Sequence, residues 1–122
     1  MQETIRQAIT NGPTLGKDGT SAFEFRFPAD ADVFAGHFPT RPLLPGVFQL
    51  EMTRIAAELL LQRPIRVREI CKAKFLRPII PEETVRVELK SLPETDTIQL
   101  RARFSVSGQA AGEALMKVTW TP

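Results

Sequence analysis

A histidine, a glycine and a glutamate within one short segment have the residue types of a proton-transfer site. His37 is the only histidine of the chain and lies in a proline-rich stretch, and Gly46 and Glu51 follow where the sequence becomes helical in character. An imidazole suits the role of base near neutral pH, and a carboxyl group kept protonated by burial suits the role of acid. The N–H of Gly46, at the start of the expected helix, can donate a hydrogen bond to a developing oxyanion. We therefore predict His37, Gly46 and Glu51 as the catalytic residues.

The pattern around these residues is long and continuous. Its members are His37, Phe38, Pro39, Pro42, Pro45, Gly46, Val47 and Glu51. The pattern resembles the active-site signature of the FabZ-type 3-hydroxyacyl-acyl carrier protein dehydratases, a branch of the hotdog-fold superfamily. A second stretch, residues 74–81, reads Lys-Phe-Leu-Arg-Pro-Ile-Ile-Pro and is similar to the family's later Phe-x-Arg-Pro-x-x-Pro turn. The two stretches occur in the family's order, which makes the resemblance specific.

The resemblance implies a reaction and a set of substrate contacts. The reaction is the dehydration of a (3R)-3-hydroxyacyl thioester to the trans-2-enoyl thioester, in fatty-acid, polyketide or aryl-polyene synthesis, without a metal or redox cofactor. The substrate would be carried on the 4′-phosphopantetheine of an acyl carrier protein or on CoA. Glu51, where another branch has aspartate, implies dehydration without isomerisation. Substrate contacts are implied for Phe38, Pro45, Val47 and Arg77.

The resemblance also implies a homodimer or higher homo-oligomer, in which each active site pairs His37 of one subunit with Glu51 of the other. A small sheet with one helix has little depth to bury a long acyl chain, and two-fold pairing is the commonest way to add a wall. One position departs from the family, which usually has glutamine where this chain has Ile55. Support for the Glu51 carboxyl group must then come from elsewhere, or the acid works differently.

Other interpretations of these residues remain open. A hotdog thioesterase would use Glu51 to activate water for hydrolysis, and a non-catalytic module would bind acyl carriers or acyl-CoA without turnover. Arg77 and its neighbouring prolines could form only a hairpin corner. A metal site is not expected, because one histidine and one cysteine without matching ligand spacing do not complete a zinc shell.

Apolar periodicity predicts the elements that position these residues. Residues 46–61 have apolar side chains on most sides of a helix, which predicts a helix surrounded by protein and closed at Arg63-Pro64. Alternating patterns predict strands at residues 23–27, 65–76, 84–91, 97–106 and 111–121, and a short amphipathic helix precedes them at the amino terminus. We expect one α+β domain over residues 1–122, a hotdog fold with an antiparallel sheet around one long helix, its last four strands in a meander.

Composition limits the remaining classes. The chain has 122 residues, 43% of them apolar and 25% charged, as in ordinary globular domains. A single cysteine, Cys71, excludes an internal disulfide framework, and we expect it to be a buried structural thiol in a cytoplasmic protein. No apolar run is long enough for a membrane span.

Positive charge is concentrated in one segment of an otherwise balanced chain. The net charge is +2, but six basic residues fall within residues 63–77. This cluster is either a solvated strand face or a docking surface for an acidic carrier protein or for pantetheine-bearing phosphates. Nucleic-acid binding is not expected, because no aromatic residues alternate with the basic ones to stack on bases.

Overall fold

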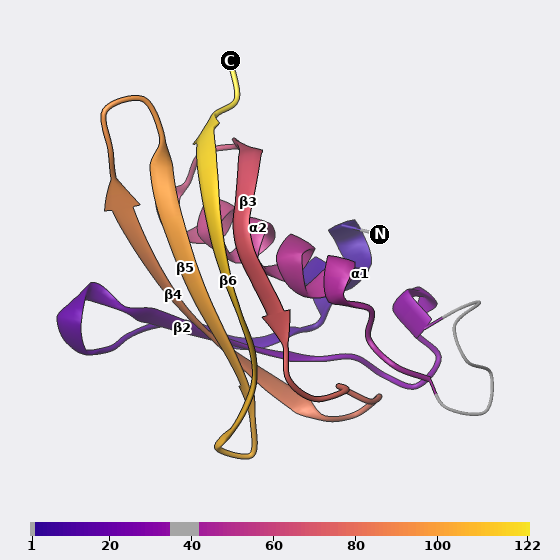
Figure 1. Cartoon of the computed structure of the whole chain (residues 1–122). Coiled ribbons are helices and arrows are strands. Elements are labelled where there is room, and N and C mark those ends of the chain that lie inside the picture. Colours follow the sequence, from indigo (N-terminus) through magenta and orange to yellow (C-terminus); the bar gives the residue numbers. More distant parts are fainter. Residues whose placement is uncertain (1, 35–41) are drawn as a thin grey trace.

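An antiparallel sheet packed against one long helix forms the molecule (Figure 1). The structure is a computed structural model and describes residues 2–34 and 42–122. The helices are α1 (Gln2–Gln7) and α2 (Gly46–Leu61), and the strands are β1 (Ile9–Leu15), β2 (Ser21–Arg26), β3 (Ile65–Phe75), β4 (Thr84–Pro93), β5 (Ile98–Val106) and β6 (Gln109–Trp120). The six strands pair in the order β1-β2-β4-β5-β6-β3, every pair antiparallel. The predicted α+β class, with an antiparallel sheet against one helix, is confirmed.

Helix α2 begins and ends where the sequence predicts. Pro45, in the extended conformation, is its N-cap, and Gln62, in the left-handed conformation with φ 56°, is its C-cap. The buried side chains of α2 are Phe48, Gln49, Met52, Thr53, Ile55, Ala56 and Ala57. Its apolar members share one core with the inward side chains of the strands, such as Phe25, Val87 and Phe104. Full burial of one large apolar side chain contributes about 1.5–3 kcal/mol, so this core fixes the position of α2 on the sheet.

The opposite side of α2 is not enclosed by its own chain. Val47 is 65% exposed and Leu59 is 39% exposed, although both lie within the helix. The expectation of a helix surrounded by protein is therefore wrong for the single chain, because one sheet covers only one side of a helix. The uncovered side of α2 carries Glu51.

Strand β1 was not expected from the sequence. Its middle, Asn11-Gly12-Pro13, has the composition of a turn, so the sequence pattern does not indicate a strand there. The strand lies at one edge of the sheet, where a proline without an N–H is tolerated, and its pairing with β2 contains register shifts. Gly12 has φ +111°, and a Cβ there would lie 2.6 Å from the Ala22 carbonyl oxygen. Both constraints require glycine at this point of the edge strand.

The predicted four-strand meander is only partly correct. Strands β4, β5 and β6 are consecutive neighbours, but β3 lies beyond β6 at the sheet edge, and β4 pairs with β2 instead. The chain leaves α2, forms the far edge strand and then crosses to the other side of the β4–β5–β6 unit. Strand patterns report which residues face the core, and they do not specify which strand is the neighbour.

Strand β3 is an exposed edge. Apart from Ile65 and Val67, all its residues are exposed, Cys71 included. The expectation of a buried Cys71 is therefore wrong, because an edge strand reaches beyond the layer that covers the sheet interior. Partial desolvation and the neighbouring Glu69 carboxylate raise the pKa of the Cys71 thiol, which makes it a weak nucleophile at neutral pH. In the part of the chain that the structure describes, no helix is long and apolar enough to cross a membrane.

Candidate active site

The two sequence motifs meet at the start of α2. The Leu44 N–H donates to the Ile79 carbonyl oxygen at 2.8 Å, which joins the loop before α2 to the turn after β3. Ile79 is 1% exposed, so this turn is anchored in the core. The second motif therefore forms a corner that fixes where α2 begins. Gly46 is the first residue of that helix, and the N–H groups of a first helical turn have no partner within the helix.

Gly46 is needed for packing as well as for its N–H. A Cβ at this position would lie 2.4 Å from Cε2 of the Phe75 ring, well inside van der Waals contact. The ring of Phe75, at the end of β3, thus lies over the first turn of α2. Gly46 thus has an aromatic neighbour in addition to its place at the start of the helix.

Gly46→Ala is expected to lower the free energy of unfolding by about 1–2 kcal/mol, the scale of mild overpacking. The cost stays moderate because Phe75 is 43% exposed and its ring can turn away. Urea unfolding of the single variant measures the loss. The double variant Gly46→Ala, Phe75→Leu should recover most of it, since the smaller side chain makes room for the methyl group. A single variant as stable as wild type would contradict this account of Gly46.

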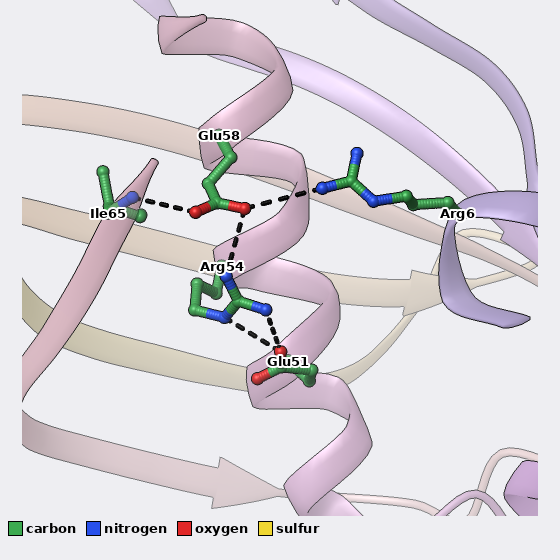
Figure 2. Close-up of polar contacts among 5 residues, drawn as sticks. All are labelled: Arg6, Glu51, Arg54, Glu58 and Ile65. Carbon is green, nitrogen blue, oxygen red and sulfur yellow. Dashed lines mark hydrogen bonds and ion pairs between the residues drawn. The ribbon is translucent and has the colours of Figure 1, made fainter. Parts of the chain in front are cut away.

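Glu51 lies on the uncovered side of α2, one turn after Val47. Its side chain is 33% exposed, so it is less buried than its apolar neighbours in the sequence suggest. Oε1 of Glu51 accepts a hydrogen bond from Nε of Arg54 at 2.9 Å and a second, short contact from the same guanidinium group. Figure 2 shows this arrangement, in which the two side chains leave α2 on the same side.

Arg54 connects Glu51 to a second carboxylate. Nη1 of Arg54 lies 3.0 Å from Oε1 of Glu58. The same oxygen lies 3.6 Å from Nη2 of Arg6 on α1. Oε2 of Glu58 accepts the backbone N–H of Ile65, the first residue of β3, at 2.8 Å. The hydrogen bond to Glu51 raises the pKa of the Arg54 guanidinium above its ordinary value, against the opposing effect of partial burial, and Glu58 adds to the rise. The row of charges thus runs from the end of α2 to the candidate acid (Figure 2).

Three of the substrate-contact residues implied by the resemblance lie within the described part of the chain. Pro45 precedes the first turn of α2, and Val47 projects from that turn into solvent. Arg77 instead forms an ion pair with Glu83 at 2.9 Å within the corner after β3. His37 and Phe38 lie outside the described residues.

The basic segment is only partly free of partners. Arg63 lies over the Trp120 ring, 4.5 Å from its centroid, and Lys72 lies 2.6 Å from Glu113 on β6. Arg66, Arg68 and Lys74 are exposed on β3. Half of the cluster therefore pairs within the chain, and the rest is available to solvent or a partner.

Arg54 is the site residue that sequence reasoning missed. The available signal was its spacing, because residues three and four apart lie on the same helix face and Arg54 stands between Glu51 and Glu58 at those separations. The family pattern has its polar partner one position later, where this chain has Ile55. Ile55 is fully buried in the core. It therefore does not reach the uncovered side of the helix, where Glu51 lies.

Comparison with known proteins identifies the family of this chain. Residues 14–114 match the model of the ApeI-like family, described as ApeI dehydratase. The chain belongs to the ApeI-like dehydratase family. The matched region contains both motifs and every predicted site residue, so the resemblance drawn from the motifs is confirmed.

Curated relatives of this ApeI-like chain are FabZ 3-hydroxyacyl-[acyl-carrier-protein] dehydratases. The FabZ of Granulibacter bethesdensis is 35% identical over 91 residues, covering 66% of this chain and 54% of the relative. The FabZ of Desulforamulus reducens is 35% identical over 94 residues, covering 70% and 66%. That of Nitrosospira multiformis is 33% identical over 100 residues, covering 73% and 68%. The match to the first two extends over about half to two thirds of their length.

Solved structures share the fold. The dehydratase heterocomplex ApeI:P from Xenorhabdus doucetiae matches with a TM-score of 0.75 and 26% identity, covering 89% of this chain and 92% of that one. An acyl-CoA hydrolase from Staphylococcus aureus matches with a TM-score of 0.64 at 9% identity, covering 89% and 70%, a likeness that concerns the fold alone. The predicted hotdog fold is confirmed by these neighbours together with the sheet-and-helix architecture.

Proposed function

We propose that this ApeI-like protein dehydrates 3-hydroxyacyl thioesters carried on an acyl carrier protein or on CoA. The observation that carries the proposal is the partly exposed Glu51 carboxyl group, one turn into a helix whose first N–H belongs to Gly46, within a chain of the ApeI-like family. Exposed Val47 lies between them on the same helix and offers an apolar contact for an acyl chain.

The proposed reaction is an elimination without a change of oxidation state overall. His37 takes the proton from C2, and the negative charge that develops on the thioester oxygen is stabilised by the Gly46 N–H. The C3–O bond then breaks, and the hydroxyl group leaves as water with a proton from Glu51. The products are a trans-2-enoyl thioester and water.

A second candidate, thioester hydrolysis, is favoured by the ion pair between Glu51 and Arg54. A carboxylate beside a guanidinium group is the form that accepts a proton from an attacking water molecule. The acid role in dehydration requires the protonated form instead. The two reactions therefore make opposite demands on the same side chain, and a direct assay separates them.

The assay follows two products from one substrate. Purified protein is incubated with 3-hydroxyacyl-CoA and with 3-hydroxyacyl-acyl carrier protein of several chain lengths. Enoyl thioester is detected by the absorbance of its conjugated system, and free thiol by a colorimetric thiol reagent. The Cys71→Ser variant is used for the thiol measurement, because the exposed Cys71 would react with the reagent. We expect enoyl thioester without free thiol; free thiol alone indicates a thioesterase, and binding without either product indicates a non-catalytic module.

We further propose that two copies pair through β3. This edge strand of 11 residues carries open backbone hydrogen-bonding groups, and Ile70 (50% exposed) and Phe75 (43% exposed) place apolar side chains on it. A long, exposed and partly apolar edge is unfavourable for an isolated chain, and an antiparallel partner strand would satisfy it. A second copy of this chain is self-complementary in that geometry, as a two-fold interface requires. The same partner would cover the open side of α2 and add a wall beside Glu51.

Cys71, near the middle of β3, provides a test of this pairing. We expect the wild-type protein to sediment as a dimer, and we expect the rate at which its Cys71 reacts with a maleimide to rise on dilution into monomers. The matched control is Ser107→Cys in a Cys71→Ser background, since Ser107 is exposed on the β5–β6 turn, away from β3. The control rate should not depend on dilution, and a monomer whose Cys71 rate is likewise unchanged by dilution would contradict the proposal. A chain that is monomeric alone but protected by a second hotdog protein would indicate a heterocomplex instead.

A further inference from the structure

Arg54 contacts only one of the two oxygens of Glu51. Its Nε and a terminal nitrogen both approach Oε1, while Oε2 has no partner among the described residues. Two donors from one planar guanidinium restrain the position of Oε1 more firmly than a single contact does. The carboxyl group is thus held by one oxygen and presents the other.

Arg54 is itself held from the opposite side. Its side chain is 14% exposed and its second terminal nitrogen lies 3.0 Å from Oε1 of Glu58. Glu58 is 13% exposed and is fixed by the Ile65 backbone N–H at 2.8 Å, with Arg6 at the edge of the group. The position of the Arg54 guanidinium group is therefore fixed by the junction of α2 and β3, and Arg54 is not a mobile surface side chain.

We infer that Arg54 is a positioning residue for the reaction, holding Oε1 of Glu51 so that Oε2 is the oxygen that exchanges a proton with the substrate or with the attacking water. The inference rests on the proposed role of Glu51 and applies to either reaction of that carboxyl group. Glu58 is the anchor of Arg54, and Ile55, buried in the core, contributes nothing to this hold.

The test compares Arg54→Met, Arg54→Lys and Arg54→Ala under saturating and limiting substrate. We expect Arg54→Met to lower kcat about 10- to 100-fold with little change in KM, because the substrate still binds but the carboxyl group is misplaced. Arg54→Lys should recover only part of this loss, since an ammonium group cannot make the two-point contact. Added guanidinium ion should restore part of the activity of Arg54→Ala and none of that of Arg54→Met, whose side chain fills the space.

Two further variants separate positioning from a general loss of structure. Arg54→Met leaves the poorly exposed Glu58 without its main partner, so it is also tested together with Glu58→Gln, in which an amide oxygen still accepts the Ile65 N–H. The matched control is Arg26→Met, which removes another arginine–glutamate pair, with Glu82, away from α2 and should keep wild-type kcat. An unchanged kcat in both Arg54→Met and the double variant would overturn the inference.

The position of the Glu51 carboxyl group tests, independently of activity, whether Arg54 holds it in place. In a crystal structure of Arg54→Met with Glu58→Gln, we expect the carboxyl group to leave its wild-type place. A carboxyl group that stays in place overturns the inference. If the wild-type protein neither dehydrates nor hydrolyses thioesters, the proposed function has failed, and this structural comparison still shows whether Arg54 positions Glu51.

Discussion

Glu51→Gln is expected to reduce kcat/KM for dehydration by at least about 100-fold, the scale of a positioned proton-transfer group. The amide keeps an oxygen that can accept from Nε of Arg54 but cannot supply the proton for the leaving hydroxyl group. Thermal stability should stay close to that of wild type, because a partly exposed ion pair contributes only about 0–1 kcal/mol. Steady-state kinetics and thermal unfolding of the same preparation measure both quantities.

Glu82→Gln is the matched control for this variant. Glu82 also forms an ion pair with an arginine, Arg26, and its Oε1 accepts the Ala29 N–H at 3.1 Å, but it lies on the turn before β4. The control should keep full activity. The wild-type pH profile of kcat/KM should be bell-shaped, as expected of a reaction that needs one base and one acid. If Glu51→Gln is as active as the control and its pH profile keeps both the acidic and the basic limb, Glu51 is not the acid.

His37→Ala is expected to cause a loss of at least about 100-fold as well, since the sequence contains no second histidine that could act as base. A mixture of His37→Ala and Glu51→Gln proteins then tests whether the site is shared. In a dimer whose sites combine the two subunits, each mixed dimer has one site with both native residues and one with neither. About a quarter of all sites should recover after random exchange, and up to about a half if only mixed dimers form.

The outcome of the mixing experiment distinguishes two arrangements of the site. A site built within one subunit gives no recovery, because every subunit carries one defective residue. The control is each variant mixed with itself under the same denaturation and refolding steps, which must stay inactive. An active wild-type monomer in sedimentation would also contradict the shared site.

The helix and most strands of this protein follow from local sequence. The Pro45-Gly46 start, the helical spacing of apolar residues and the break at Arg63-Pro64 specify α2 residue by residue. Alternating apolar residues likewise specify β2 and the four strands after α2, because burial of one sheet face requires that period. The sequence does not predict strand β1. Its side chains are almost all exposed, so it lacks the alternation of apolar residues that identifies buried strands.

The candidate site was also partly specified in advance. The types and order of His37, Gly46 and Glu51 predict the chemistry, because proton transfer needs a base, an acid and an oxyanion donor in a limited range of residue types. The sequence did not show that Phe75 would lie against Gly46, or that Leu44 would bind Ile79. These contacts join segments about 30 residues apart, and no local pattern encodes which distant surface will meet the helix start.

What the sequence alone determined is thus the fold class, the long helix and the residue types of the site. Tertiary structure decided the strand order, the exposure of β3 with Cys71, and the hold of Arg54 on Glu51. The physical reason is the range of the interactions. Periodicity and helix termini depend on neighbours along the chain, whereas strand pairing and the burial of charged side chains depend on which surfaces the whole chain brings together. Arg54 depends on both kinds of interaction. Its spacing from Glu51 and Glu58 is local, but its anchor, Glu58, is held by the Ile65 N–H only after β3 has packed beside α2.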